Sequence, residues 1–316
     1  MLKKIIPPLA ILCLIFTFLV ILAGGVVRTT GSGMGCPDWP KCFGQYVPPT
    51  TISELPSDYK TLFAVNGKEI ATFSAFKTWV EYINRLLGAL LGVLFFVLFL
   101  CSLSYLKERK EIPILAFLVL FATGFQGWLG SLVVASDLNA VKITIHMLVA
   151  IFILVLCVAI LFALRPSTIV VYNPSHKKTM VRFLVLAIGT TLVQVTIGTQ
   201  VREIVDWVSK SYQEGFRELW MGLVEEEVLF KIHRTFSWAV LIINGVILRD
   251  FLMDKKYYWG LFLVVMIGLE IAVGIGMAHF NIPAYLQPVH LLLATGIVAF
   301  QSWILLSILT PRCLTK

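Results

Sequence analysis

Charged residues are scarce in this chain of 316 residues: Asp, Glu, Lys and Arg together account for 14% of it, whereas 58% is hydrophobic. With a mean hydropathy of +0.88, the chain has too little polar surface to cover a water-soluble globule. It contains eight apolar runs, each as long as the roughly 20 residues that a membrane-spanning helix needs. The sequence therefore predicts an all-α polytopic membrane protein with eight transmembrane helices.

Targeting segments are lacking as well. No small-residue cleavage site follows the first apolar run, so we expect this run to be retained as the first helix. No Arg- and Ser-rich transit peptide comes before it. This favours a multi-pass protein of a prokaryotic plasma (inner) membrane.

Acidic residues are few in the short segments between apolar runs, where most of the Lys and Arg behind the formal charge of +8 are found. This bias predicts that these segments face the cytoplasm together with both chain termini. Residues 28–79 and 201–229, which carry most of the acids, are then expected to be two long outer loops. Because the lipid bilayer accounts for the charge bias, no nucleic-acid partner is expected.

Histidine is also rare, with five in the chain. Three of them, His146, His233 and His290, stand near the start of apolar runs and would lie at one depth near the outer face. His176 and His279 do not share this placement and are interpreted as ordinary histidines. The shared depth of the first three makes them candidate ligands.

The second half of the sequence repeats motifs of the first half in the same order and with similar spacing. Four helices in each copy give both copies the same orientation, so a pseudo-twofold axis along the membrane normal would relate them. We therefore predict two four-helix bundles, residues 1–165 with the long outer loop and residues 166–316. The matched residues are Gly24 with Gly198, Arg28 with Arg202, Asn84-Arg85 with His233-Arg234, Gln126 with Glu270, Gly130 with Gly274, and His146 with His290.

The C-terminal half carries two of the candidate ligands. Histidines on facing helices of a four-helix bundle commonly hold a haem iron from both sides. His233 and His290 therefore predict a bis-histidine haem site, and Arg234 and Arg202 near the same surface would pair with the propionates.

The N-terminal half has His146 opposite Asn84 at the matching positions. An asparagine amide is a poor iron ligand, so a haem here would have His146 as its one protein ligand and a face open to substrate. Glu81, one turn before Asn84, is a candidate functional acid at the mouth of a helix. The alternative interpretation is that Glu81 is solvated at the interface or paired with Arg85.

Three polar residues inside apolar runs, Gln126, Gln194 and Glu270, each precede a glycine by four residues. This spacing places both members on one helix face. The polar side chains would contact a ligand, or they would join two helices where the glycine allows close approach. We favour helix packing for Gln194, and both interpretations stay open for Glu270.

Cysteine is nearly absent from the outer segments, where Cys36 and Cys42 alone are found. Because the outer compartment is oxidising, the pair is interpreted as a disulfide rather than as two free thiols. The loop contains no histidine and offers too few ligands for a metal site.

These residues resemble the haem A synthase family, membrane enzymes that convert haem O to haem A for terminal oxidases. The resemblance covers nearly the whole chain. Its most specific part is the outer-loop motif of residues 25–33 followed by Cys36-Pro37-Asp38-Trp39-Pro40 and Cys42. The further matches are Glu81-Tyr82, Arg85, His146, Gln194, Gly198, Arg202, His233-Arg234 and His290.

The resemblance implies an oxidoreductase acting on a CH group. The C8 methyl group of haem O would be oxidised to a formyl group by successive hydroxylations. The partners expected on this basis are haem O, the lipid bilayer, haem O synthase and further copies of the same chain.

The resemblance also implies roles for individual residues. His233 and His290 would ligate a haem b cofactor in the C-terminal bundle, and His146 would ligate the substrate iron in the N-terminal bundle. Glu81 matches the family's functionally important acid, and the cysteine pair serves the substrate side. The other residues expected at the substrate are Asn84, Arg85 and Arg28.

The chain departs from the family at Asn84, where histidine is usual, and residues 201–229 lack the cysteine pair that some members have there. Two other classes of protein share part of the pattern. A bis-histidine cytochrome b in quinol-linked electron transfer would bind the same haem without a catalytic acid at an open second site. A transporter with parallel repeats would have similar polar residues within its helices but would be colourless.

Overall fold

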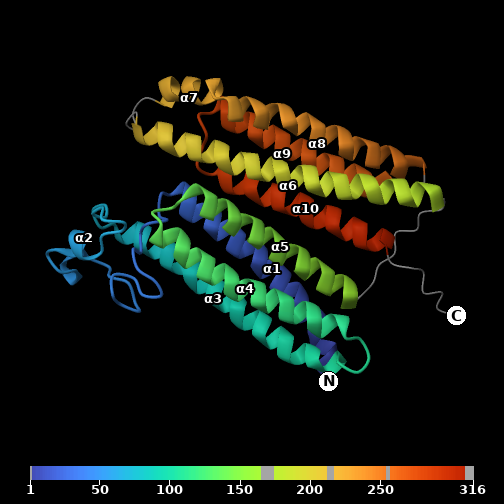
Figure 1. Ribbon diagram of the computed structural model, residues 1–316, viewed down its shortest axis with the longest axis horizontal. Helices are drawn as coiled ribbons and strands as arrows, with labels where there is room; N and C mark the ends of the chain where they lie inside the picture. The colour runs from blue at the N-terminus through green and yellow to red at the C-terminus, as the bar shows by residue number, and fades with distance from the viewer. Residues whose placement is uncertain (1, 165–173, 212–216, 254–256, 310–316) are drawn as a thin grey trace. The chain divides into compact units, whose positions relative to one another are not determined.

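The computed structural model describes residues 2–164, 174–211, 217–253 and 257–309 (Figure 1). Within these residues the regular structure is helical, apart from isolated bridges in the loop after the first helix. Eight of the described helices are long and apolar enough to cross a membrane, which confirms the predicted fold class. These spans are α1 (Leu2–Thr29), α3 (Ala75–Ser102), α4 (Glu111–Ala135), α5 (Ala140–Leu164), α6 (Pro174–Ser211), α8 (Val228–Met253), α9 (Tyr257–His279) and α10 (Leu286–Leu309).

The chain divides into two compact units, Met1–Cys157 and Val158–Lys316. The boundary predicted between residues 165 and 166 lies outside the described residues and stays a prediction, as does the pseudo-twofold axis. Short helices join the spans of each unit. They are η1 (Ile52–Glu54), α2 (Tyr59–Leu62), η2 (Leu103–Tyr105) and α7 (Arg217–Glu226).

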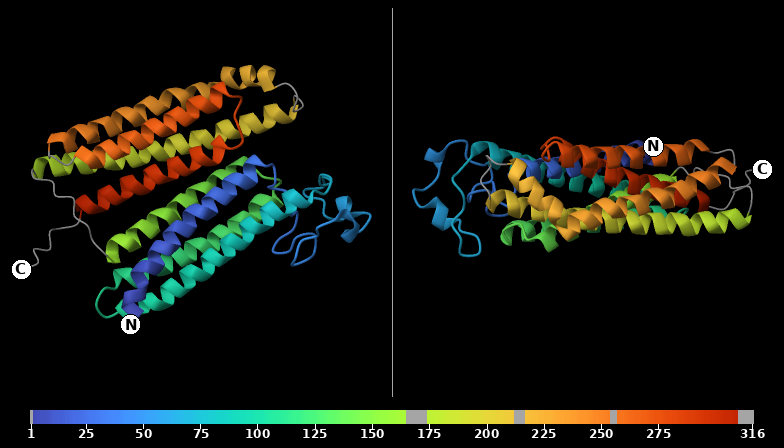
Figure 2. Two further views of the ribbon diagram at one scale, coloured as in Figure 1. Left: turned by 180° about the vertical axis from the view of Figure 1, so that it is seen from behind. Right: turned by 90° about the horizontal axis from the view of Figure 1, so that it is seen from above.

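The first unit is a bundle in which each helix packs on two others (Figure 1, Figure 2). α1 packs on α3, and α3 packs on α4. Gln126 of α4 donates a hydrogen bond to a backbone carbonyl of α5. Oγ1 of Thr17 on α1 and Sγ of Cys157 on α5 are 3.8 Å apart and form a hydrogen bond. Phe95 of α3 is fully buried in the same unit.

The second unit has the same cyclic order of neighbours: α6 packs on α8, α8 on α9, α9 on α10, and α10 on α6. Its core contains a buried polar group as well as aliphatic residues. Gln301 of α10 donates from Nε2 to Thr191 of α6 at 3.2 Å and to Asn244 of α8 at 3.1 Å. Interhelical hydrogen bonds of this kind stabilise helix association in a bilayer, where the hydrophobic effect does not favour it because lipid tails are as apolar as the helices.

Residues 201–229 are mostly helical, so the prediction of a loop there was wrong, whereas their outer location stays a prediction. α6 continues to Ser211, and α7 packs against it and against α8. Val205 and Val208 of α6 are buried together with Trp220 of α7. Apolar residues three and four apart continue one buried side of α6 toward its end at Ser211, so the helix extends over 38 residues.

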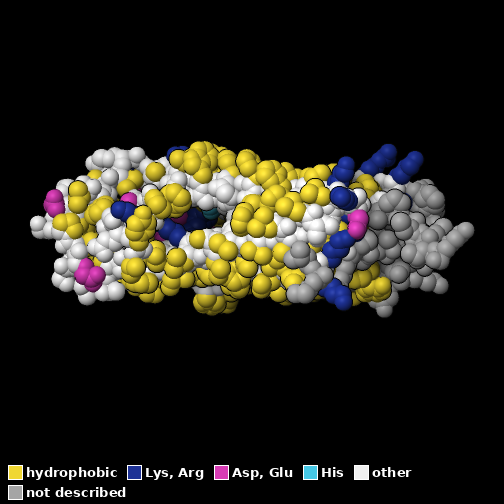
Figure 3. Space-filling model, turned by 90° about the horizontal axis from the view of Figure 1, so that it is seen from below, with side chains coloured by type: hydrophobic (Ala, Val, Ile, Leu, Met, Phe, Trp, Pro, Cys, Tyr) yellow, Lys and Arg dark blue, Asp and Glu magenta, His cyan; other side chains and the backbone are white. Residues whose placement is uncertain are grey.

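Hydrophobic side chains are spread over much of the middle of the face in Figure 3, where few charged side chains are visible. Lys and Arg side chains gather at one end of this face. Toward the other end the surface is hollowed, and basic side chains are visible inside the hollow.

Candidate functional site

His233 of α8 and His290 of α10 face each other in the second unit. Their ring centres are 6.4 Å apart, and the ring planes are at 74°. An imidazole nitrogen lies about 2 Å from a metal ion that it binds, so two imidazoles on opposite sides of one ion have centres about 6 Å apart. The pair predicted from the sequence therefore has the separation that one iron between the rings requires.

Each of the three candidate histidines rests against a glycine on a neighbouring helix. A Cβ at Gly130 or Gly198 would lie closer to the ring than most Cβ contacts do, so the ring would have to shift, whereas at Gly274 it would be just in ordinary contact. A Cβ added to Gly130, Gly198 or Gly274 would lie 3.3, 3.0 or 3.4 Å from Cε1 of His146, His233 or His290, respectively.

Two of these glycines are preceded, four residues earlier, by a glutamine that binds the same histidine. Gln126 donates from Nε2 to the backbone carbonyl of His146 at 2.8 Å, and Gln194 donates to that of His233 at 2.9 Å. Gln194 thus joins two helices, as the helix-packing interpretation expects, and Gln126 does the same. Glutamine and glycine together fix the height and the approach of each histidine.

Glu270 occupies the corresponding position before Gly274. Its Oε1 lies 3.1 Å from Nδ1 of His290, which is within hydrogen-bonding distance. Nδ1 of His290 is buried and makes no formed hydrogen bond within the described residues, so the two groups are in contact but not yet hydrogen-bonded. Of the three supporting side chains, Glu270 is the one that contacts the ring rather than the backbone.

The matching position between α1 and α3, which we call the α1–α3 corner, has the glycine but neither the histidine nor the supporting polar side chain. Asn84 takes the place of the histidine, and Val20 takes the place of the glutamine, four residues before Gly24. A Cβ added to Gly24 would have nothing within 4 Å, and Oδ1 of Asn84 is buried without a hydrogen-bond partner. His146 is therefore the one histidine of residues 1–157.

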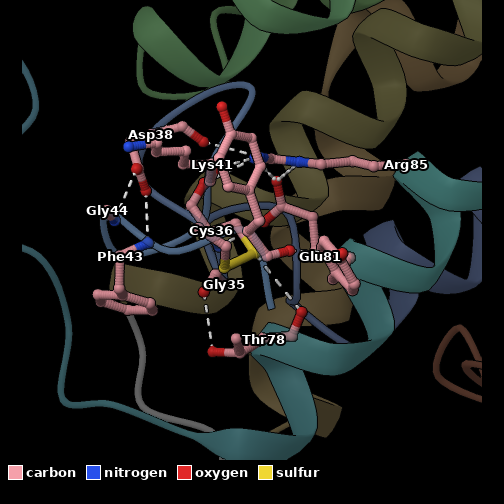
Figure 4. Close-up of a disulfide and its surroundings, with 12 residues drawn as sticks. Gly35, Cys36, Asp38, Lys41, Phe43, Gly44, Thr78, Glu81 and Arg85 are labelled. Atoms are coloured by element: carbon pink, nitrogen blue, oxygen red, sulfur yellow. Dashed lines mark hydrogen bonds and ion pairs between the residues drawn. A yellow bond between two sulfur atoms is a disulfide. The ribbon is translucent and has the colours of Figure 1, made fainter. Parts of the chain in front are cut away.

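The predicted disulfide between Cys36 and Cys42 is confirmed, and the loop that it closes is bound to the first turns of α3 (Figure 4). The guanidinium of Arg85 donates to three carbonyl oxygens of this loop. They belong to Cys36, Asp38 and Lys41, at 2.7, 2.6 and 3.1 Å. Arg85 thus holds the loop on the helix.

Glu81 is enclosed by the same loop, and 3% of it is exposed. Its Oε2 accepts the backbone N–H of Cys36 at 2.8 Å, and its Oε1 forms an ion pair with Arg85, whose Nε is 3.1 Å away. The pairing with Arg85 that we considered as an alternative is therefore present. A catalytic role of Glu81 stays a prediction.

Arg202 and Arg234, expected near the propionates, and Arg28, expected at the substrate, have different surroundings. Arg202 pairs with Asp206 one turn later on α6, Arg234 is exposed on α8, and Arg28 is half-buried at the end of α1. His279 is exposed at the end of α9, as expected of an ordinary histidine. The side chain of His176 lies outside the described part of the chain.

Two residues that the sequence analysis did not single out help to fix the loop (Figure 4). Thr78 donates from Oγ1 to the carbonyl oxygen of Gly35 at 2.8 Å. A Cβ added to Gly35 would collide with the backbone carbonyl of Lys77. Thr78 could have been found from its spacing, because it lies three residues before Glu81 and so on the same helix face.

We expect Gly35→Ala to loosen the loop, because the added methyl group meets backbone that cannot move aside. Overpacking of this kind costs about 1–3 kcal/mol. Limited proteolysis of the purified protein should cut residues 36–74 faster in Gly35→Ala than in the wild type. Glu69→Ala, at an exposed position of the same loop, is the control. Equal cleavage rates for Gly35→Ala and the control would contradict this account of the loop.

By fold and site, this is a polytopic membrane protein whose paired histidines fit a haem iron. Residues 8–302 match the family model COX15-CtaA, cytochrome oxidase assembly protein. The chain belongs to this family, as its resemblance to haem A synthases led us to expect.

The chain is also similar to curated proteins named heme A synthase. The protein of Shewanella oneidensis is 29% identical over 199 residues, which are 63% of this chain and 55% of that protein. The protein of Ehrlichia canis is 24% identical over 321 residues, covering 93% of this chain and 90% of the relative. The protein of Rickettsia felis is 22% identical over 332 residues, covering 95% and 97%.

Proposed function

We propose that this protein is a haem A synthase, an oxidoreductase that converts the C8 methyl group of haem O to the formyl group of haem A. The family match over residues 8–302 and the relatives named heme A synthase support this function. The observation that carries it is the unequal pair of sites. One unit has two facing histidines, whereas the other has a single histidine and a disulfide-closed loop.

The second unit is proposed to hold a resident haem b between His233 and His290. When bound, the haem supplies one-electron redox chemistry. The chain contributes the positions of the two rings, which Gln194, Gly198 and Gly274 support. Arg202 and Arg234 are the proposed partners of the propionates.

The first unit is proposed to bind haem O, with His146 as the ligand of the substrate iron. Gln126 and Gly130 hold His146 at a fixed height on α5. Asn84 is too weak a ligand to close the opposite side, so that side stays accessible. The other residues proposed for the substrate side are Glu81 as the functional acid, Arg28, and Arg85, which acts by fixing the loop.

The proposed location is a prokaryotic plasma membrane with both termini in the cytoplasm. The Lys and Arg residues of the short connecting segments support this orientation. It also places the bond between Cys36 and Cys42 in an oxidising compartment. Haem O synthase would supply the substrate, and a second copy of the chain is a further proposed partner.

The function is tested by expressing the chain in cells that make haem O but lack their own haem A synthase. Haem extracted from these cells should contain haem A, which is absent from cells with the empty vector. If the purified protein contains haem b while the cells accumulate haem O alone, the chain is a membrane cytochrome b and the proposal is wrong.

A further inference from the structure

The three supported histidines differ in what supports them. Gln126 and Gln194 are neutral and bind backbone carbonyls, so the rings of His146 and His233 receive no charge from them. Glu270 is an acid and lies against the ring of His290. The two proposed ligands of the second unit are therefore unequal.

The contact between Glu270 and His290 is sheltered. Their side chains are 15% and 24% exposed, and the Nδ1 to Oε1 distance is 3.1 Å. The other carboxylate oxygen, Oε2, is buried and makes no hydrogen bond within the described residues. At 3.1 Å, Oε1 is near enough to accept Nδ1–H of His290 in a hydrogen bond.

The opposite ring has no acid beside it. Nδ1 of His233, like that of His290, is buried without a formed hydrogen bond, but its helix-packing neighbour is the neutral Gln194, which donates to the backbone carbonyl of His233. Within the described residues, His290 is therefore the ring of the pair whose Nδ1 lies next to a carboxylate.

A carboxylate that accepts Nδ1–H has two effects on a metal-binding histidine. It fixes the tautomer in which the lone pair of Nε2 is free for the metal, and it makes the ring a stronger electron donor. Stronger donation and a nearby negative charge both favour the oxidised state of a haem iron, so the reduction potential falls. The separation of the atoms suits this effect because Coulomb interactions are strong in a sheltered site.

We infer that Glu270 is a positioning residue that lowers the reduction potential of the haem held between His233 and His290, by accepting the Nδ1 proton of His290 in a hydrogen bond. This inference rests on the proposed haem b site. It makes α9, which supplies no iron ligand, the helix that sets how readily the cofactor accepts an electron.

The test is Glu270→Gln, because glutamine is the residue that already stands at this place before Gly130 and Gly198. The variant should keep its haem and its low-spin spectrum. In a spectroelectrochemical titration of the purified protein, its redox equilibrium should shift at least tenfold toward the reduced form, which is 59 mV for a one-electron couple. Glu226→Gln removes the same charge from an exposed position on α7 and should leave the potential unchanged.

A second variant guards against a folding defect. Glu270→Asp keeps the charge but withdraws the carboxylate, so it should shift the potential in the same direction by a smaller amount. An unchanged potential in haem-loaded Glu270→Gln would overturn the inference. So would loss of haem from both variants at normal protein levels, since Glu270 would then maintain the fold of the site. A wild-type protein without low-spin haem would instead disprove the proposed haem b site.

Discussion

Purified His233→Ala and His290→Ala proteins are expected to lose the six-coordinate low-spin haem spectrum of the wild type. Each histidine would supply one of the two axial ligands. Because the ring centres are 6.4 Å apart, on opposite sides of the proposed iron position, the remaining histidine cannot replace the lost one. The iron would become five-coordinate and high-spin, or the haem would be lost during purification. Reduced-minus-oxidised spectra and haem content per protein measure both outcomes.

His279→Ala is the matched control, because His279 is exposed at the end of α9. Its spectrum and haem content should equal those of the wild type. If both ligand variants kept the wild-type low-spin spectrum, the assignment of His233 and His290 as axial ligands would be wrong.

Glu81→Gln is expected to reduce haem A formation about a hundredfold or more, the usual contribution of a general acid or an electrostatic group. The substitution keeps the shape of the side chain and one acceptor for the N–H of Cys36, but it removes the charge that pairs with Arg85. Haem A would be measured in cells that lack their own enzyme. The haem b spectrum should persist, because its ligands belong to the second unit.

The control must distinguish a role of Glu81 in the reaction from its role in holding the loop on α3. Thr78→Val removes the neighbouring hydrogen bond from α3 to Gly35 and leaves Glu81 in place. If Glu81 acts on the substrate, Glu81→Gln should be far less active than Thr78→Val. Similar activities in the two variants, at equal protein levels, would limit Glu81 to holding the loop.

The helices could be predicted well from the sequence because a bilayer imposes long apolar runs with few charges. The exception is the end of α6. Val205 and Val208 lie among acids and seemed to belong to a loop, yet they are buried against Trp220 of α7. Mean hydropathy does not detect a helical segment that is stabilised through one apolar side.

The candidate site could be predicted only in part. The spacing of Glu81 and Arg85 indicated a pair one helical turn apart, and this pair is present. The N–H of Cys36 that completes it comes from 45 residues earlier, and no local pattern reveals such a contact. Likewise, the spacing of Glu270 and Gly274 indicated a shared face of α9, but the packing of α9 on α10 determines that this face meets His290.

The space beside Gly24 in the α1–α3 corner is open, although no histidine occupies the facing position. Asn84→His alone would supply the ring without the carboxamide that steadies His146 and His233, because Val20 cannot donate a hydrogen bond. The change that reproduces the arrangement of His146 and His233 is therefore the double variant Asn84→His with Val20→Gln. A haem with one histidine ligand exchanges more readily than a haem with two. The double variant is therefore expected to retain its haem, whereas the wild-type site is suited to a substrate that binds and leaves.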